Sequence, residues 1–482
     1  MNQRIAWANM LLAILLLTAD SRTVSAQPQP ISRLVLPPQG ARPFPVVVVI
    51  GGGKEFDVLA QHGLAVAHTN GGIASDFNRG YRSAKATVRW LSANGRSVNL
   101  DPDRIATIGI SKNGNAATGV ALSRGLGAIT FGERVEIAPG GRDDPAERVR
   151  CAVNLCGTTD LMQTDRFGGT KTGGPMNMTI AVAMANSAIN YVSRDDPPVL
   201  LLFPFGGGAH GWVSGHRFDA AYRRAGLQST LLLAGMRNWE ALAVDFFAMH
   251  LQDRKSPTRV HVIAGGNASQ GGPCCGWFTV VRFGDLSKEL AVKYSAAGGK
   301  VCKPLSGTVT IAAGQTSAEI VVHPLATGTV TVDLVADQAY ELGANRQAKI
   351  GVVSGVVPGV YAVCTRPYAK PPQGRGLITV ARWGSTTQAL AVNYSVLGNA
   401  VAGTDYRPLP GKITLAAGQR SATIEVVPLK YPRRGETYKS VALSLDRGEG
   451  YEFGPYCGAA CVVLTDEAAP DTPEIGDPFG VR

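Results

Sequence analysis

The sequence predicts a multidomain protein in which an α/β domain is followed by two all-β sandwiches in tandem. Three observations indicate this fold class: apolar runs that alternate with helical patterns up to residue 251, period-two alternation from residue 260, and an internal repeat. The chain has 482 residues, too many for one ordinary core, and its 58 glycines and 29 prolines favour short strands and many turns.

The N-terminal residues 1–26 have the pattern of an export signal peptide. Arg4 supplies positive charge, residues 5–18 form an apolar run, and Val24-Ser25-Ala26 offers small residues for cleavage. An uncleaved anchor is the alternative, and no membrane span is expected once the signal is removed. We therefore expect a secreted, periplasmic or cell-envelope protein, whose eight cysteines form disulfides or buried thiols rather than metal sites.

Changes in composition divide the rest of the chain into five segments. They are an α/β domain at 27–251, a polar linker at 252–259, a degenerate first sandwich at 260–355, a second sandwich at 356–467 and a disordered acidic tail at 468–482. The formal charge is +11, but lysine and arginine are scattered and no nucleic-acid-binding motif is present, so no nucleic-acid partner is expected.

Six continuous apolar runs in the α/β domain are expected as strands covered on both faces. They lie at residues 46–50, 64–68, 105–110, 151–156, 199–203 and 230–234. Helix-like spacing falls at residues 80–93, 115–123, 214–225 and 239–250. This alternation predicts a mostly parallel sheet with helices on both faces.

The C-terminal half repeats itself. A shift of 100 residues aligns TVVRFGDLSKELAVKYS at 279–295 with TVARWGSTTQALAVNYS at 379–395. Four more residues of shift align GTVTIAAGQTSAEIVVHPL with GKITLAAGQRSATIEVVPL, and a further seven align AYELG with GYEFG. Short alternating strands in units of this length predict two β-sandwiches of one kind.

The stretch IGISKNGNAATG, residues 108–119, has the pattern of a strand that turns sharply into a helix, with Ser111 at the corner. Such a turn exposes the serine Oγ and directs backbone N–H groups at a developing oxyanion. Gly109 and Gly114 flank the serine in a G-x-S-x-x-G pattern, which is looser than G-x-S-x-G. A serine that caps a helix gives the same letters, so the corner alone leaves both interpretations open.

The surrounding motifs resemble the α/β-hydrolase esterases of the feruloyl and acetyl-xylan esterase type over residues 33–251. DPDRI at 101–105 and DPPVLLL at 196–202 are the most specific, and GISKNGN is similar to the serine elbow of glucuronoyl esterases. The resemblance implies that Ser111 is a nucleophile, that Lys112 lies near the oxyanion, and that Gly52 in the triple-glycine turn is a backbone donor.

The same resemblance shows that both partners of the serine are replaced. Gly207 stands where the triad Asp is expected, and Asn238 stands where the His is expected. His210 is the substitute candidate for the base and Asp160 for the orienting acid. Structural roles are the alternative: His62 and His68 as structural residues, His250 as a helix-end cation, and Asp160 as a turn or helix cap.

The repeats resemble Calx-β domains, and the second copy matches better, with AGTDY at 402–406 and AAGQRSATI at 416–424. The resemblance implies acidic calcium positions at Asp405, Glu436 and Asp466, with Glu467 beside them. The neighbouring loop KYPRRGE carries three basic residues that would oppose a dication, so a structural or adhesive role without metal is the other expectation. No cofactor beyond calcium is expected.

Two functions are therefore open. The replaced triad positions favour an exported surface or extracellular binding protein whose catalysis is impaired. The intact corner favours a serine carboxylesterase that acts on polysaccharide esters with Ser111 and a relocated base. In either case a polysaccharide or cell-surface glycan is the expected partner.

Overall fold

A computed structural model describes residues 30–40, 42–51, 53–70, 77–123, 144–161, 186–203, 209–233, 239–252, 257–270, 276–354, 358–370, 374–432, 439–453 and 458–465. Within these ranges, the side chains of residues 77–79, 209–213, 233, 269–270, 383 and 453 are not described. The expected signal peptide and the acidic tail lie outside the described ranges.

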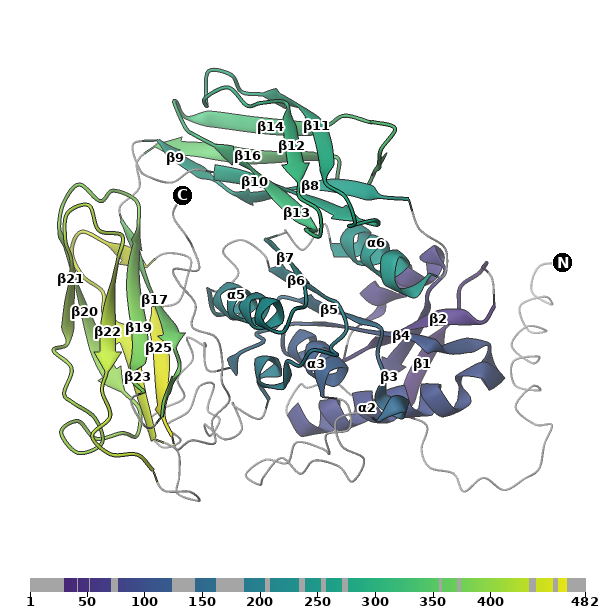
Figure 1. The fold of residues 1–482 in the computed structure, drawn as a ribbon, viewed down its shortest axis with the longest axis horizontal. Helices are drawn as coiled ribbons and strands as arrows, with labels where there is room; N and C mark the ends of the chain where they lie inside the picture. The colour runs from purple at the N-terminus through teal and green to yellow at the C-terminus, as the bar shows by residue number, and fades with distance from the viewer. Residues whose placement is uncertain are drawn as a thin grey trace.

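The α/β domain is built on one seven-stranded sheet with the strand order β1-β3-β2-β4-β5-β6-β7 (Figure 1). The strands are β1 (Ile31–Val35), β2 (Phe44–Val49), β3 (Ala65–Thr69), β4 (Leu100–Ile110), β5 (Cys151–Leu155), β6 (Val199–Phe203) and β7 (Ser229–Leu233). Neighbouring strands are parallel except β1, which pairs with β3 antiparallel at the edge. The six expected strands are confirmed, and β1 is an additional one.

Helices cover both faces of this sheet. The elements are α2 (Phe77–Asn94), α3 (Lys112–Leu122), α5 (Ala209–Arg224), α6 (Trp239–Leu251) and the 3₁₀ helices η1 (Lys54–His62), η2 (Gly95–Val98), η3 (Pro145–Glu147) and η5 (Ala188–Tyr191). Val46 and Val48 of β2 enter the core with α2, α3 and α5, whereas Val47 and Val49 enter the opposite core with η1 and α6. Because successive strand residues alternate between faces, β2 must be apolar throughout, as the sequence pattern indicates.

The rest of the described chain forms two β-rich units, each with a four-stranded and a five-stranded sheet. The first unit contains β8 (Arg259–Gly266), β9 (Ala268–Gln270), β10 (Gly276–Phe283), β11 (Leu290–Ala297), β12 (Thr308–Ile311), β13 (Ser317–Val322), β14 (Gly328–Leu334), β15 (Glu341–Leu342) and β16 (Gln347–Ser354). The second contains β17 (Gly359–Arg366), β18 (Tyr368–Ala369), β19 (Gly376–Trp383), β20 (Leu390–Leu397), β21 (Lys412–Leu415), β22 (Ser421–Val426), β23 (Lys439–Leu445), β24 (Glu452–Phe453) and β25 (Ala459–Leu464).

The two units share one topology. The sheet orders are β13-β10-β8-β15 and β12-β11-β14-β16-β9 in the first unit, and β22-β19-β17-β24 and β21-β20-β23-β25-β18 in the second. Arg282 and Arg382, 100 residues apart, are each 1% exposed and donate to backbone carbonyl oxygens at matching places, that of Ala312 after β12 and that of Ala416 after β21. The structure thus confirms the internal repeat strand by strand.

The two units pack against the α/β domain through opposite sheets. At the first junction, Ile263 and Phe283 of β8 and β10 enter the core with α6. At the second junction, Tyr368 of β18 and Cys461 and Val463 of β25 enter the core with α5. These strands lie in the four-stranded sheet of one unit and the five-stranded sheet of the other. Both units therefore share hydrophobic core with the α/β domain, and Figure 1 shows them along different sides of it.

Among the helices that the structure describes, none combines the length and the apolar character needed to cross a membrane.

Candidate active site

Ser111 lies at the corner between β4 and α3 in a backbone conformation that residues with a side chain rarely adopt. Its φ is 57° and its ψ is −128°, and its side chain makes no capping hydrogen bond to the helix. An N-cap serine normally has extended backbone and accepts a hydrogen bond from the first turn, so the capping interpretation does not fit. The residue is exposed, as a serine on a sharp strand-to-helix turn should be.

Three glycines allow the backbones around Ser111 to approach closely. A Cβ on Gly109 would lie 2.2 Å from the Asn113 carbonyl oxygen, and one on Gly114 would lie 2.5 Å from Asn154 Oδ1. A Cβ on Gly157, in the loop after β5, would lie 2.5 Å from the Ser111 carbonyl oxygen. Side chains at these positions would therefore push β4, α3 and the loop after β5 apart.

Asn154 of β5 organises this close packing, and sequence reasoning missed it. It is fully buried, and its Oδ1 accepts from Gly157 N at 2.7 Å while its Nδ2 donates to Thr118 Oγ1 of α3 at 3.0 Å. A polar residue inside an apolar strand was the available signal, because a buried amide must find hydrogen-bond partners.

The triple-glycine turn lies on the opposite side of the corner from the loop after β5. Gly51 N donates to Thr69 Oγ1 at 3.4 Å, and Asn113 Nδ2 donates to the Gly51 carbonyl oxygen at 3.3 Å. Gly52 itself lies outside the described ranges. Lys112 is the first residue of α3, where helix geometry leaves backbone N–H groups without an intrahelical acceptor. The candidate oxyanion donors therefore belong to two segments that Asn113 connects.

Cys156, which directly follows β5, is a further neighbour of the serine. Its φ is 51°, and its N–H donates to the carbonyl oxygen of Leu202 at 2.7 Å. Burial raises the pKa of the thiol, and the neighbouring backbone of Ser111 offsets part of that shift. The thiol is therefore protonated at neutral pH and is a poor competing nucleophile.

The histidines fall into two groups. The side chain of His210, the candidate base, is not described, although its backbone lies in the first turn of α5, close after the carboxyl end of β6. The other four histidines of the α/β domain have positions away from a catalytic role. His62 pairs with Glu240, and His68 lies 2.8 Å from Asp57. Burial lowers the pKa of both His216 and His250 to about 4, and the charge of Arg223 contributes to the shift at His216. The expected helix-end cation at His250 is thus wrong, because burial keeps its ring neutral.

Asp160, the candidate orienting acid, is held by an arginine. Its Oδ2 lies 2.8 Å from Nε of Arg217, and the exposed fractions of the two side chains are 2% and 0%. The carboxylate therefore forms a buried ion pair between the loop after β5 and α5. Gly207 and Asn238, which stand at the expected triad positions, lie outside the described ranges.

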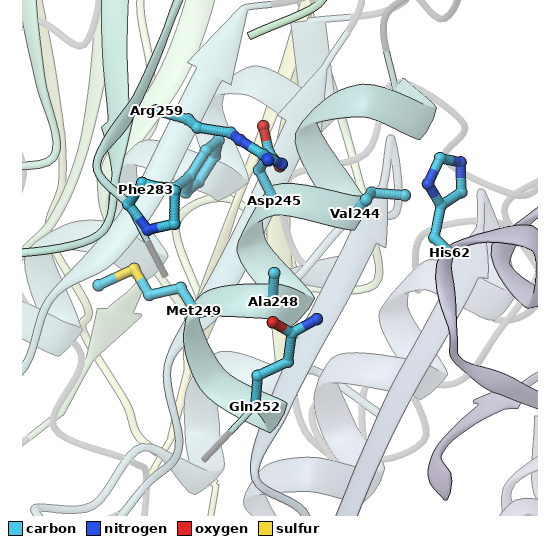
Figure 2. A pocket seen from close by; sticks show the side chains of 9 residues that line it. His62, Val244, Asp245, Ala248, Met249, Gln252, Arg259 and Phe283 are labelled. Carbon is cyan, nitrogen blue, oxygen red and sulfur yellow. The ribbon is translucent and has the colours of Figure 1, made fainter. Parts of the chain in front are cut away.

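A cavity of about 190 Å³ at the first junction contains none of the candidate catalytic residues. Its wall includes Phe283 and Met249, and Figure 2 shows Arg259 directed toward Asp245. Arg259 is paired with both Asp245 and Glu341, so its charge is already balanced. The cavity shows no unbalanced charge that would select a ligand.

The implied calcium positions are only partly described. Asp405 is buried, and its Oδ2 accepts from Val401 N at 2.8 Å and lies 3.4 Å from Nζ of Lys439. A lysine ammonium beside this carboxylate opposes a divalent cation at Asp405. Glu436, Asp466 and Glu467 lie outside the described ranges, and no group of three acidic, histidine or cysteine residues suited to a metal occurs within them.

Part of the chain is similar to a known protein family. Residues 33–204 match the model of the BD-FAE family, which is less than half of the chain. The match includes Ser111 and Asp160 and ends before Gly207 and Asn238. No curated protein matches the chain.

Solved structures that match part of the chain at low identity include three proteins. A truncated carbohydrate esterase from gut microbiota has a TM-score of 0.37 and 16% identity, and the alignment covers 45% of this chain and 89% of that one. The bifunctional GH43-CE protein of Bacteroides eggerthii has a TM-score of 0.37 and 20% identity, with coverage of 45% and 36%. The acetyl ester-xyloside bifunctional hydrolase of Caldicellulosiruptor lactoaceticus has a TM-score of 0.34 and 18% identity, with coverage of 44% and 86%. These TM-scores are too low to support an argument. The family match is the finding that shows an esterase-like α/β-hydrolase domain.

Proposed function

We propose that the α/β domain is a serine carboxylic ester hydrolase with Ser111 as its nucleophile. The observation that carries this proposal is the backbone of Ser111, which holds an exposed side chain at φ 57° without any capping bond. A non-glycine residue in such a conformation costs about 1–3 kcal/mol, a cost that structures keep mainly where the conformation serves chemistry. A glycine would make the same turn with less strain but would lack the hydroxyl.

In the proposed reaction, Ser111 Oγ attacks the ester carbonyl carbon and the carbonyl oxygen becomes the oxyanion. The backbone N–H groups of Lys112 and Gly52 donate to this oxygen, and the ammonium of Lys112 favours its negative charge. The alcohol leaves with the proton that the base took from Ser111, and water then hydrolyses the acyl-serine, giving the carboxylic acid and restoring the hydroxyl of Ser111. His210 is the proposed base that accepts the proton of Ser111, because it follows the carboxyl end of β6 at the edge of the sheet where Ser111 also lies.

We propose ester groups of polysaccharides as the substrate class and an exported protein as the setting. The BD-FAE match and the signal-like N-terminus motivate these assignments. The two β-rich units are proposed to be Calx-β-like modules that act as glycan-facing or structural parts without bound calcium. The proposal includes no calcium because Lys439 pairs with Asp405, one of the positions that would bind it.

A binding protein with an impaired esterase fold is the second candidate. Its specific support is that Asp160 forms a buried ion pair with Arg217 and that no histidine with a described side chain hydrogen-bonds to Ser111. Without a base, the serine would lack the activation that acyl transfer needs. The α/β domain would then present its sheet edge as a glycan-binding surface.

Fluorophosphonate labelling distinguishes the two candidates. Purified mature protein is expected to be labelled, and labelling should disappear in Ser111→Ala and fall strongly in His210→Gln. Circular dichroism should show that all three proteins are folded. A folded wild-type protein that takes no label would overturn the esterase proposal and favour the binding protein, and labelling that survives in Ser111→Ala would exclude Ser111 as the nucleophile.

A further inference from the structure

One arginine connects the second β-rich unit to the loop after β5. Arg217 of α5 is fully buried, its Nε lies 2.8 Å from Asp160 Oδ2, and its Nη1 donates to the carbonyl oxygen of Cys364 at 2.9 Å. Asp160 belongs to the loop after β5, whereas Cys364 belongs to β17 of the second unit. In Figure 1, α5 is the helix of the α/β domain nearest this unit.

The loop that Asp160 ends is the one that packs against the serine corner. Gly157 sits so close that a Cβ there would lie 2.3 Å from Asn115 N and 2.5 Å from the Ser111 carbonyl oxygen. Thr159, next to Asp160, also bonds to α5, because its N–H and its hydroxyl both bond to Ser214. A shift of α5 or of this loop would therefore be transmitted to the backbone of Ser111.

The second unit also keeps this ion pair away from water. Tyr368 of β18 is 6% exposed, and the pKa of its hydroxyl is raised by burial first and then by the negative charge of Asp160. Burial raises the pKa of the Cys461 thiol of β25, with the charge of Asp160 contributing. Both residues thus lie within electrostatic reach of the pair, and removing the unit would expose the pair and take away the Cys364 carbonyl.

We propose that the second β-rich unit is a structural part of the serine site, and that Arg217 and Asp160 are positioning residues that transmit its docking to Ser111. The Cys364 carbonyl oxygen of the unit accepts a hydrogen bond from Arg217, and Arg217 forms an ion pair with Asp160. Asp160 in turn fixes the loop after β5 against the corner. The effect on catalysis rests on the proposed esterase function, whereas the effect on the geometry of the loop does not.

The test compares the two junctions. Arg217→Lys keeps the charge near Asp160, but a single ammonium cannot reproduce the guanidinium fork that reaches both partners. Asp245→Asn breaks a partly buried ion pair at the first junction, where Arg259 and His261 are the partners of Asp245. The second-order rate of fluorophosphonate labelling and the hydrogen exchange of the Ser111 and Cys156 amides are measured in both variants, together with the thermal midpoint Tm.

Arg217→Lys is expected to slow labelling by about tenfold to a hundredfold, because small displacements of a nucleophile have effects of that size. It should also speed exchange of the two amides, whereas Asp245→Asn should lower Tm and leave both readouts at the wild-type values. Unchanged labelling and exchange in Arg217→Lys, or changes in both variants that simply follow the loss of Tm, would overturn the proposal. If the wild-type protein takes no label, the esterase function fails, and the exchange comparison alone decides whether the second unit orders the corner.

Discussion

Asn113 Nδ2 donates a hydrogen bond to the carbonyl oxygen of Gly51 across 3.3 Å, joining the first turn of α3 to the triple-glycine turn. In the strict G-x-S-x-G pattern, the residue two positions after the serine is glycine. Here Asn113 occupies that position, its carbonyl oxygen closely approaches Gly109, and its side chain spans the space to the other candidate oxyanion segment. The departure from the strict motif thus adds a bridge between the two expected donors.

We expect Asn113→Ala to lower the fluorophosphonate labelling rate about tenfold, less than the roughly 10²–10³ in rate lost with a direct oxyanion donor. The substitution frees the triple-glycine turn and leaves the serine in place. Because Asn113 is only partly buried, the free energy of unfolding should change by less than about 1 kcal/mol. Labelling kinetics and urea unfolding measure the two effects.

Asn94→Ala is the matched control for this bridge, since Asn94 also donates from an exposed amide to a backbone carbonyl, that of Trp90 in α2. It should have a comparably small effect on stability and none on labelling. Equal labelling rates in Asn113→Ala and the wild-type protein would show that the bridge does not position the donors.

Ser111→Gly should stabilise the protein by about 1 kcal/mol. The strain of a non-glycine residue at φ 57° costs about 1–3 kcal/mol, and the larger entropy that glycine loses on folding offsets about 0.5–1 kcal/mol of the relief. Ser111→Ala keeps the Cβ and loses no capping bond, so its free energy of unfolding should stay within about 0.5 kcal/mol of the wild type.

Urea unfolding of the two Ser111 variants measures this difference, and both should lose labelling. Equal free energies of unfolding for the glycine and alanine variants would show that the corner is not strained. The backbone conformation of Ser111 would then no longer support the proposed function.

The α/β domain was predictable because its strands are buried on both faces and appear as uninterrupted apolar runs. β1 escaped prediction because it is a short edge strand that contains Ser32 and Arg33 and is only partly buried. The strand-for-strand repeat was visible in the sequence, but docking through opposite sheets was not. Docking depends on residues of β8 and β25 that face the α/β domain, such as Ile263 and Val463. Their apolar character indicates that they are buried, but it does not identify the element that buries them.

The site was predictable at its corner and not around it. Ser111 and the flanking Gly109 and Gly114 form a local pattern that predicted the sharp turn between β4 and α3, but the pattern alone left the role of the serine open. The partner of Asp160 depends on how α5 lies across the loop after β5, which places Arg217, 57 positions later in the chain, beside the carboxylate. No local pattern distinguishes a carboxylate that will meet an arginine from one that will meet a histidine.

Calcium should leave the Tm of the protein unchanged. Asp405 already accepts from Val401 N and pairs with Lys439, so binding a dication there would require displacing an ammonium. Differential scanning calorimetry in EDTA and in excess calcium chloride tests this expectation, with magnesium chloride as the control for ionic strength. A rise in Tm that calcium alone produces would mean that Asp405 exchanges its lysine for the metal.

The first junction should weaken in acid through Asp245. Burial raises the pKa of this carboxyl, but hydrogen bonds from His261 and Arg259, together with their charges, outweigh burial and hold the pKa below its ordinary value. A carboxyl with a lowered pKa stabilises the folded state above the unfolded pKa of about 3.9, and that stabilisation is lost as pH falls through the folded pKa. The network therefore contributes fully at neutral pH and progressively less below about pH 4.

Asp245→Asn removes the charge and should lower the free energy of unfolding at pH 7 by about 2 kcal/mol. This is less than the 3–5 kcal/mol typical of a fully buried pair, because Arg259 is 42% exposed. The difference between variant and wild type should shrink as pH falls below about 3.9, because the unfolded chain then takes up the proton that the folded protein resists. Urea unfolding at pH 7 and at pH 3 measures both differences. A gap of the same size at both values would mean that the aspartate acts at this junction through shape and hydrogen bonding, with no contribution from its charge.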